Sequence, residues 1–149
     1  MSGSRAASIE VGRRLRIAQV APPMERVPPR GYGGTERAVH ELVTELDRRG
    51  HTLTTFASGD SVVPGRLMAT VPESLRPAGF AGDPAPYVYQ TIRAVLDHAD
   101  EFDIIHTHAY LWGLPFGPMA QAPLVHTLHI VPDENNALLW RQYPRARVT

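Results

Sequence analysis

The alternation of apolar and polar positions predicts strands and helices that follow one another along the chain. Short apolar runs rich in β-branched residues indicate strands, whereas apolar residues repeated every three or four positions indicate helices. The expected strands cover residues 15–20, 52–56, 102–106 and 124–128, with weaker signals at 67–71 and 147–149. The expected helices cover residues 36–49, 87–99 and 134–143, together with a short segment at 111–120 that contains two prolines.

The helix at 36–49 has the clearest pattern. Its apolar residues fall on one face, and Gly50 follows as a stop. Because this helix joins strands 15–20 and 52–56, it predicts a βαβ unit with parallel strands. The continued alternation predicts a doubly wound α/β domain, with a mainly parallel sheet in a three-layer α/β/α sandwich. We expect this domain to cover residues 15–149 and residues 1–14 to form a disordered tail.

A glycine-rich segment, GYGGTE at 31–36, opens that helix. Gly33 and Gly34 lack the Cβ atoms that would keep a ligand away from the backbone. The following helix directs free N–H groups and the positive end of its dipole to the same place. Together with Thr35, these glycines are therefore a candidate phosphate or carboxylate site. The alternative is a glycine turn followed by a Thr35 N-cap, with no ligand.

Three histidines stand where strands are expected to end. His106 and His108 close the third confident strand and His129 follows the fourth, and α/β sheets bind ligands beyond the carboxyl ends of their strands. These histidines, with His126, also allow a metal-site hypothesis. No acidic residue stands beside the His106–His108 pair, so we expect no metal. A metal-dependent hydrolase stays as the less favoured alternative.

Composition narrows the class of protein. Fifteen basic residues balance fifteen acidic ones, so no net charge favours nucleic acid or a membrane surface. The chain contains no cysteine and hence no thiol nucleophile or disulfide. No apolar run approaches the roughly 18–20 residues of a membrane span. We therefore expect a cytoplasmic protein that does not bind nucleic acid, although peripheral contact with a membrane stays possible.

Several segments, in their order and spacing, resemble one known family. They are IAQV at 17–20, the proline-rich loop after it, YGGTE at 32–36, RGH at 49–51, FDIIHTH at 102–108, VHTLH at 125–129 and LWRQYP at 139–144. Together they resemble the N-terminal domain of family-four-type glycosyltransferases of the GT-B fold. The resemblance spans residues 15–149 and implies a Rossmann-like domain, one half of a GT-B fold.

The resemblance also implies a function. Members are retaining transferases that move a sugar from a nucleotide sugar, a co-substrate, to an acceptor, without metal or other cofactor. The glycine loop approaches the donor phosphates and the acceptor, which maps onto Gly33, Gly34 and Thr35. A histidine near the transferred sugar maps onto His129 as the catalytic residue. His106 and His108 would line the acceptor side of the cleft.

The family's C-terminal, donor-binding domain has no counterpart in this sequence. We therefore expect the chain to need that missing domain as a partner and to be inactive alone. Two alternatives stay open beside the transferase. One is a non-catalytic α/β module that binds phosphate or carbohydrate, and the other is the histidine-metal hydrolase.

Overall fold

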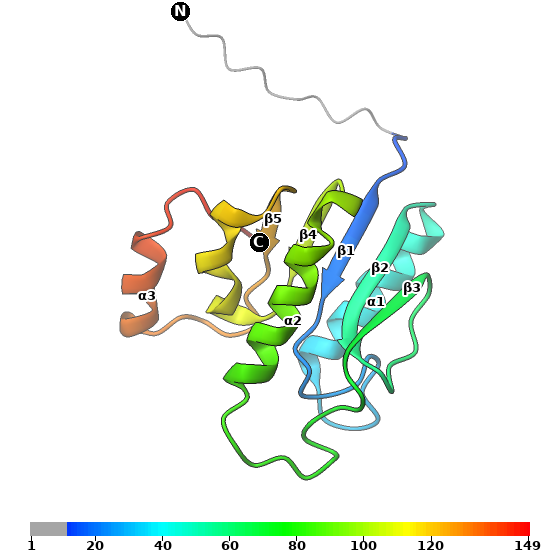
Figure 1. Cartoon of the computed structure of the whole chain (residues 1–149), viewed down its shortest axis with the longest axis horizontal. Helices are drawn as coiled ribbons and strands as arrows, with labels where there is room; N and C mark the ends of the chain where they lie inside the picture. The colour runs from blue at the N-terminus through cyan, green and yellow to red at the C-terminus, as the bar shows by residue number, and fades with distance from the viewer. Residues whose placement is uncertain (1–11) are drawn as a thin grey trace, which may run out of the picture.

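Within the described residues, six parallel strands form a single sheet, in the spatial order β3-β2-β1-β4-β5-β6. The structure is a computed structural model and describes residues 12–149. Figure 1 shows the sheet with β1 and β4 near its centre. The strands are β1 (Arg16–Val20), β2 (Thr52–Ser58), β3 (Arg66–Val71), β4 (Ile104–Thr107), β5 (Leu124–His126) and β6 (Arg147–Val148).

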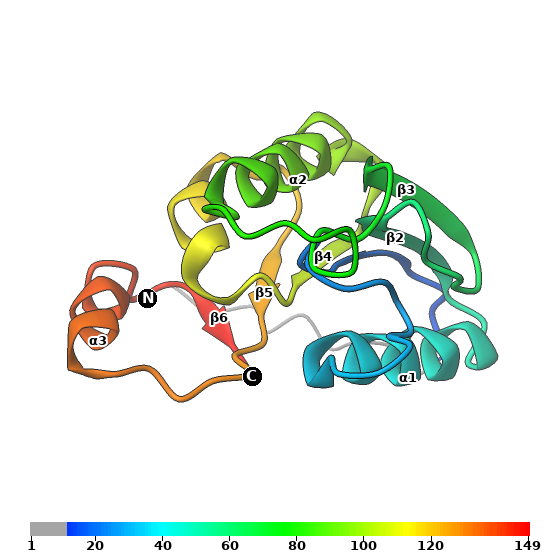
Figure 2. The same cartoon turned by 90° about the horizontal axis from the view of Figure 1, so that it is seen from below.

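Helices cover both faces of the sheet, which confirms the predicted three-layer α/β fold. Figure 2 shows α1 (Gly34–Arg48) on one face, with α2 (Ala85–Asp97) and the 3₁₀ segment η2 (Tyr110–Met119) on the other. A short 3₁₀ turn, η1 (Ala99–Glu101), leads into β4. The last helix, α3 (Glu134–Arg141), lies beyond the β5–β6 end of the sheet (Figure 1).

Within residues 12–149 the core has three clusters: two lie on opposite faces of the sheet, and the third packs α2 against η2. Successive residues of a strand point to opposite faces. In β1, Ile17 packs with Val39 and Val43 of α1, whereas Val20 packs with Phe56 and Val95 on the α2 face. The apolar face of α1 therefore packs against the β1 residue that points to that side of the sheet.

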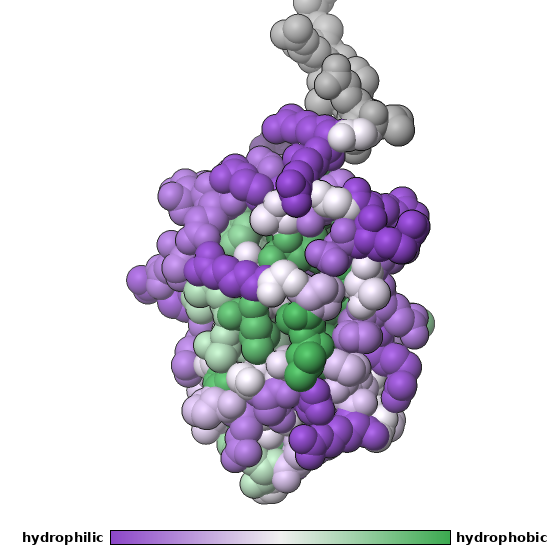
Figure 3. All heavy atoms as spheres, turned by 90° about the vertical axis from the view of Figure 1, so that its right-hand side faces the viewer, coloured by the Kyte–Doolittle hydropathy of each residue, from purple (hydrophilic) through white to green (hydrophobic). Residues whose placement is uncertain are grey.

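The edge strand β3 is open to solvent along one side. Figure 3 views this side of the molecule and shows apolar side chains in its middle, bordered by hydrophilic ones. Leu67 and Met68 of β3 are only half-buried. Within residues 12–149, no helix is long and apolar enough to cross a membrane.

Some sequence predictions need correction. The N-cap of α1 is Gly33, with φ 145° and no side-chain cap bond, and not Thr35, which lies in the first turn. The segment at 111–120 forms a 3₁₀ helix rather than an α-helix, because Pro115 and Pro118 cannot donate to an α-helical ladder. The predicted tail lies mostly outside the described residues.

Candidate functional site at the carboxyl edge of the sheet

The connection pattern of the sheet predicts a ligand crevice between the carboxyl ends of β1 and β4. The chain moves from β1 outward through β2 to β3, and then returns to β4 and moves the opposite way. Such a reversal is the switch point at which doubly wound sheets bind ligands, beyond the carboxyl ends of the strands. Here the strands end at Val20 and Thr107, and the backbone N–H of His108 donates to the Val20 carbonyl at 2.9 Å.

The histidines that the sequence places at strand ends do come together at this crevice. His108 Nδ1 lies 2.9 Å from His129 Nε2, and the rings of His106 and His108 lie 4.3 Å apart between centroids. His106 Nε2 is also 2.6 Å from Thr127 Oγ1. His129 is thus bonded to another imidazole.

Gln19 connects the two neighbouring histidines, and the sequence analysis did not single it out. Its Oε1 lies 2.9 Å from His108 Nε2 and its Nε2 lies 3.3 Å from His106 Nδ1. The side chain is only 1% exposed. The available signal was a single amide among the apolar residues at 17–20, since a buried amide requires hydrogen-bond partners.

Burial favours the neutral form of these imidazoles. It lowers the pKa of His108 to about 3, with the charges of His106 and His129 adding to the effect. Burial and the charge of His129 also lower the pKa of His106, and burial lowers that of His129. At neutral pH each ring therefore has one N–H donor and one nitrogen acceptor.

The glycine loop lies at the same edge, where α1 begins. Gly33 adopts a positive φ of 145°, and a Cβ there would lie 2.7 Å from Pro29 Cβ, so both backbone and space require glycine. A Cβ on Gly34 would meet nothing within 4 Å. The space beside Gly34 is therefore open to a ligand at the helix N-terminus. Among the described residues, no hydrogen bond joins this loop to the histidines.

Glu36, in the first turn of α1, is a buried carboxylic acid. It is only 5% exposed, and its Oε2 lies 3.0 Å from the place that a Cβ on Gly33 would take. Burial raises its pKa, and the charge of Glu25 adds to that effect. A buried carboxylic acid with a raised pKa therefore lies beside the start of α1.

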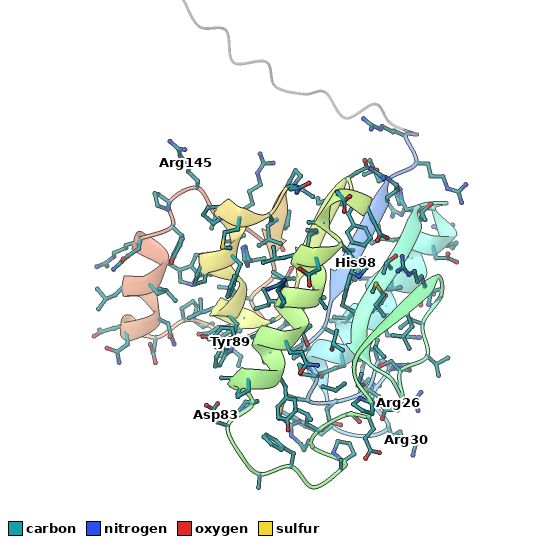
Figure 4. All side chains as sticks on the ribbon, viewed as in Figure 1. Arg26, Arg30, Asp83, Tyr89, His98 and Arg145 are labelled. Carbon is teal, nitrogen blue, oxygen red and sulfur yellow. The ribbon has the colours of Figure 1, made fainter. Side chains whose placement is uncertain are left out.

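Arginines of the proline-rich loop border this edge. Figure 4 shows Arg26 and Arg30 near the carboxyl ends of the strands. The Nε atom of Arg26 is buried and has no hydrogen-bond partner among residues 12–149. A buried guanidinium N–H without a partner costs free energy.

His126 lies on the other face of the sheet and does not join the cluster. Its ring is 2% exposed and meets Trp140 edge-on at 6.2 Å. In the described part of the chain, no group of three or more histidine, aspartate or glutamate side chains is arranged to hold a metal ion. Two cavities of about 570 Å³ lie away from His106, His108 and His129, one near His51 and one beside His126.

Comparison with known proteins decides the family. The model of Glycosyltransferase Family 4 matches residues 32–149, well over half of the chain. The chain belongs to this family. It is 26% identical to the D-inositol 3-phosphate glycosyltransferase of Thermobifida fusca (strain YX), over 89% of this chain and 34% of that protein.

A solved structure agrees with this assignment. AviGT4, a glycosyltransferase involved in avilamycin A biosynthesis, matches 78% of this chain and 32% of its own, with 25% identity and a TM-score of 0.50. The family, the glycosyltransferase domain and the Rossmann-like fold expected from the sequence are thereby confirmed. The chain spans about a third of the length of both relatives.

Proposed function

We propose that this chain forms the acceptor-side half of a retaining glycosyltransferase that takes its sugar from a nucleotide sugar. The reaction breaks the bond between the sugar C1 and the donor phosphate and joins C1 to the oxygen of an acceptor hydroxyl on the same face of the ring. The nucleoside diphosphate leaves and takes up the hydroxyl proton. A second, donor-binding domain would close the cleft over the crevice between β1 and β4. The proposal needs no metal or other cofactor and places the enzyme in the cytoplasm.

The observation that carries the proposal is the pairing of an anion site with neutral imidazoles at one edge. The N–H groups of Gly34 and Thr35 stand at the start of α1 beside open space. Such groups stabilise the negative charge that develops on a leaving phosphate. Arg26, with its unpartnered buried Nε, supplies positive charge in the neighbouring loop.

His129 is the side chain that we propose to contact the transferred sugar. It is exposed at the crevice, and its Nε2 is held by His108 at 2.9 Å. A ring held by one nitrogen presents the other in a fixed direction, which favours the ordered geometry that catalysis requires. His106 is bonded on both sides, so we assign it and His108 to the support of the acceptor side.

The test is a transfer assay with two forms of the protein. One is the 149-residue chain, and the other is the same chain joined to the remaining part of the Thermobifida fusca relative. A panel of nucleotide-sugar donors is offered with D-inositol 3-phosphate, the acceptor in the relative's name, and with other hydroxyl-bearing acceptors. We expect transfer only by the joined form, because the groups proposed in this chain contact only the phosphate and the sugar of the donor, which is too little to hold it in a near-attack geometry.

Two results would contradict the proposal. One is sugar transfer at the same rate by the 149-residue chain alone, which would show that no second domain is needed. The other is a joined protein that binds donor and acceptor by calorimetry but transfers nothing, as a non-catalytic binding module would. Inversion at C1 in the product would overturn the retaining assignment by itself.

A further inference from the structure

Gln19 is a buried amide whose two ends both bond to histidines. It lies on β1 with Thr55 of β2 as its neighbour on one side and His106 of β4 on the other. The amide oxygen bonds to His108 at 2.9 Å and the amide nitrogen to His106 at 3.3 Å. With 1% exposure, the side chain has little water available to replace either bond.

The donor and acceptor ends of an amide are fixed, whereas those of a neutral imidazole can exchange. The amide oxygen only accepts and the amide nitrogen only donates, whereas either imidazole nitrogen can carry the hydrogen. His108 must therefore carry its hydrogen on Nε2 to donate to Gln19. His106 must keep Nδ1 free to accept from Gln19, so its hydrogen lies on Nε2.

The hydrogen positions on His106 and His108 then determine those of their next hydrogen-bond partners. Because His108 Nδ1 is left as an acceptor, His129 donates to it from Nε2. His106 Nε2 donates to Thr127 Oγ1, which lies 2.7 Å from Thr149 Oγ1 and can donate onward to it. One amide orientation thus fixes the hydrogen positions of three imidazoles and a hydroxyl.

We propose that Gln19 is a positioning residue that sets His106, His108 and His129 in the Nε2–H form and leaves His129 Nδ1 as a hydrogen-bond acceptor. Its consequence for ligands rests on the proposed function. A nitrogen with a free lone pair accepts a hydrogen bond from a hydroxyl group of the sugar or of the acceptor substrate, and it repels a phosphate oxygen. The donor phosphate would then bind the N–H groups of Gly34 and Thr35. The phosphate and the sugar of the donor are thus bound by different elements.

The experiment reads hydrogen positions directly and needs no turnover. The 149-residue chain is labelled with ¹⁵N-histidine, and two-bond ¹H–¹⁵N correlation spectra at pH 7.5 distinguish the two neutral forms of each ring. Rings are assigned from single substitutions at His106, His108 and His129. We expect the Nε2–H pattern for all three histidines of the unsubstituted chain.

Substitutions at Gln19 then test its role. Gln19→Met keeps the length of the side chain but has no amide, so the rings of His106 and His108 should become mixtures of both forms. Gln19→Glu offers an acceptor at both ends, so His106 should carry its hydrogen on Nδ1 while His108 keeps Nε2–H. Thr55→Val is the matched control, because Thr55 lies beside Gln19, is fully buried, and its Oγ1 has no partner among the described residues. It should leave the three histidine patterns unchanged.

Two outcomes would overturn the inference. An Nδ1–H pattern for His108 in the unsubstituted chain would show that the amide has the opposite orientation. Single-form spectra that survive in Gln19→Met would show that Gln19 does not set them. Should that variant fail to fold, the spectrum of the unsubstituted chain still decides the first point. The outcome of the transfer assay leaves this result untouched, so the two proposals fail separately.

Discussion

Gly33 and Gly34 are neighbours in the sequence but have different structural requirements. Gly33 has φ 145°, and an added Cβ would lie 2.7 Å from Pro29 Cβ, whereas a Cβ on Gly34 would meet open space. We predict that Gly33→Ala lowers the free energy of unfolding by roughly 1–3 kcal/mol, while Gly34→Ala changes it by less than about 0.5 kcal/mol. Urea unfolding of the two variants checks this, and equal losses would contradict it.

The same two residues show what the sequence could and could not predict. The glycine pair marked the start of α1 correctly, because glycines before an amphipathic pattern are a direct local signal. The choice of Gly33 over Thr35 as the cap depends on a backbone angle that residue types alone do not fix. Gln19 was missed for a related reason, since its partners follow it by more than eighty positions in the chain.

Buried His126 gives a prediction about pH. Burial and the charge of His106 lower its pKa to about 4, against about 6.5 in an unfolded chain. Its neutral form therefore stabilises the fold fully above about pH 6.5, and this contribution is lost as pH falls toward about 4. The loss approaches roughly 1.4 kcal/mol per pH unit for a single proton.

His126→Leu removes this titration and the buried Nδ1 atom, which has no partner among the described residues. We predict that the free energy of unfolding of the variant falls less between pH 7 and pH 4.5 than that of the unsubstituted chain. A residual slope remains in the variant, since burial also lowers the pKa of His108. Denaturant curves at the two pH values provide the measurement, and parallel losses in both proteins would refute it.

At the scale of elements, the strongly patterned segments formed where they were expected, and the weaker strand signals at 67–71 and 147–149 also formed strands, β3 and β6. The segment at 111–120 changed type. Helix α1 and strands β1 and β2 have periodic or continuous apolar signals, and their ends differ from prediction by at most two residues. Strand β5 ends at His126 rather than at residue 128. The prolines of η2 break the helical ladder, so its apolar content alone was a poor guide to its form.

The packing of α1 against the sheet gives a prediction about how this helix contributes to the stability of the fold. Val43 is fully buried against β1 and β2, so Val43→Ala removes two methyl groups from a filled layer. We expect a loss of about 2 kcal/mol in the free energy of unfolding. Glu41→Ala is the control, because Glu41 is exposed on the same helix and should cost less than about 0.5 kcal/mol. Similar losses would show that α1 does not pack through this face.

For the whole molecule, the alternation of strands and helices was sufficient to predict the parallel, doubly wound sheet. The order β3-β2-β1-β4-β5-β6 was not predicted, because strand neighbours depend on which way each crossover turns. That order puts the switch point between β1 and β4 and so explains why histidines from β4 and the segment after β5 meet beside Gln19. The local patterns of the sequence determine the elements, and the topology determines the site.

The central claim is that the carboxyl edge of this sheet is the place of sugar transfer. The most direct test measures transfer by the chain joined to a donor-binding domain, with His129→Ala and Gly34→Val compared to the unsubstituted protein. We predict that each variant loses tenfold or more in turnover, on the order of 1.4 kcal/mol of transition-state stabilisation, with an unchanged circular dichroism spectrum. His40→Ala, a histidine substitution on α1 away from the edge, should keep the normal rate. Near-normal turnover by both His129→Ala and Gly34→Val would contradict the claim.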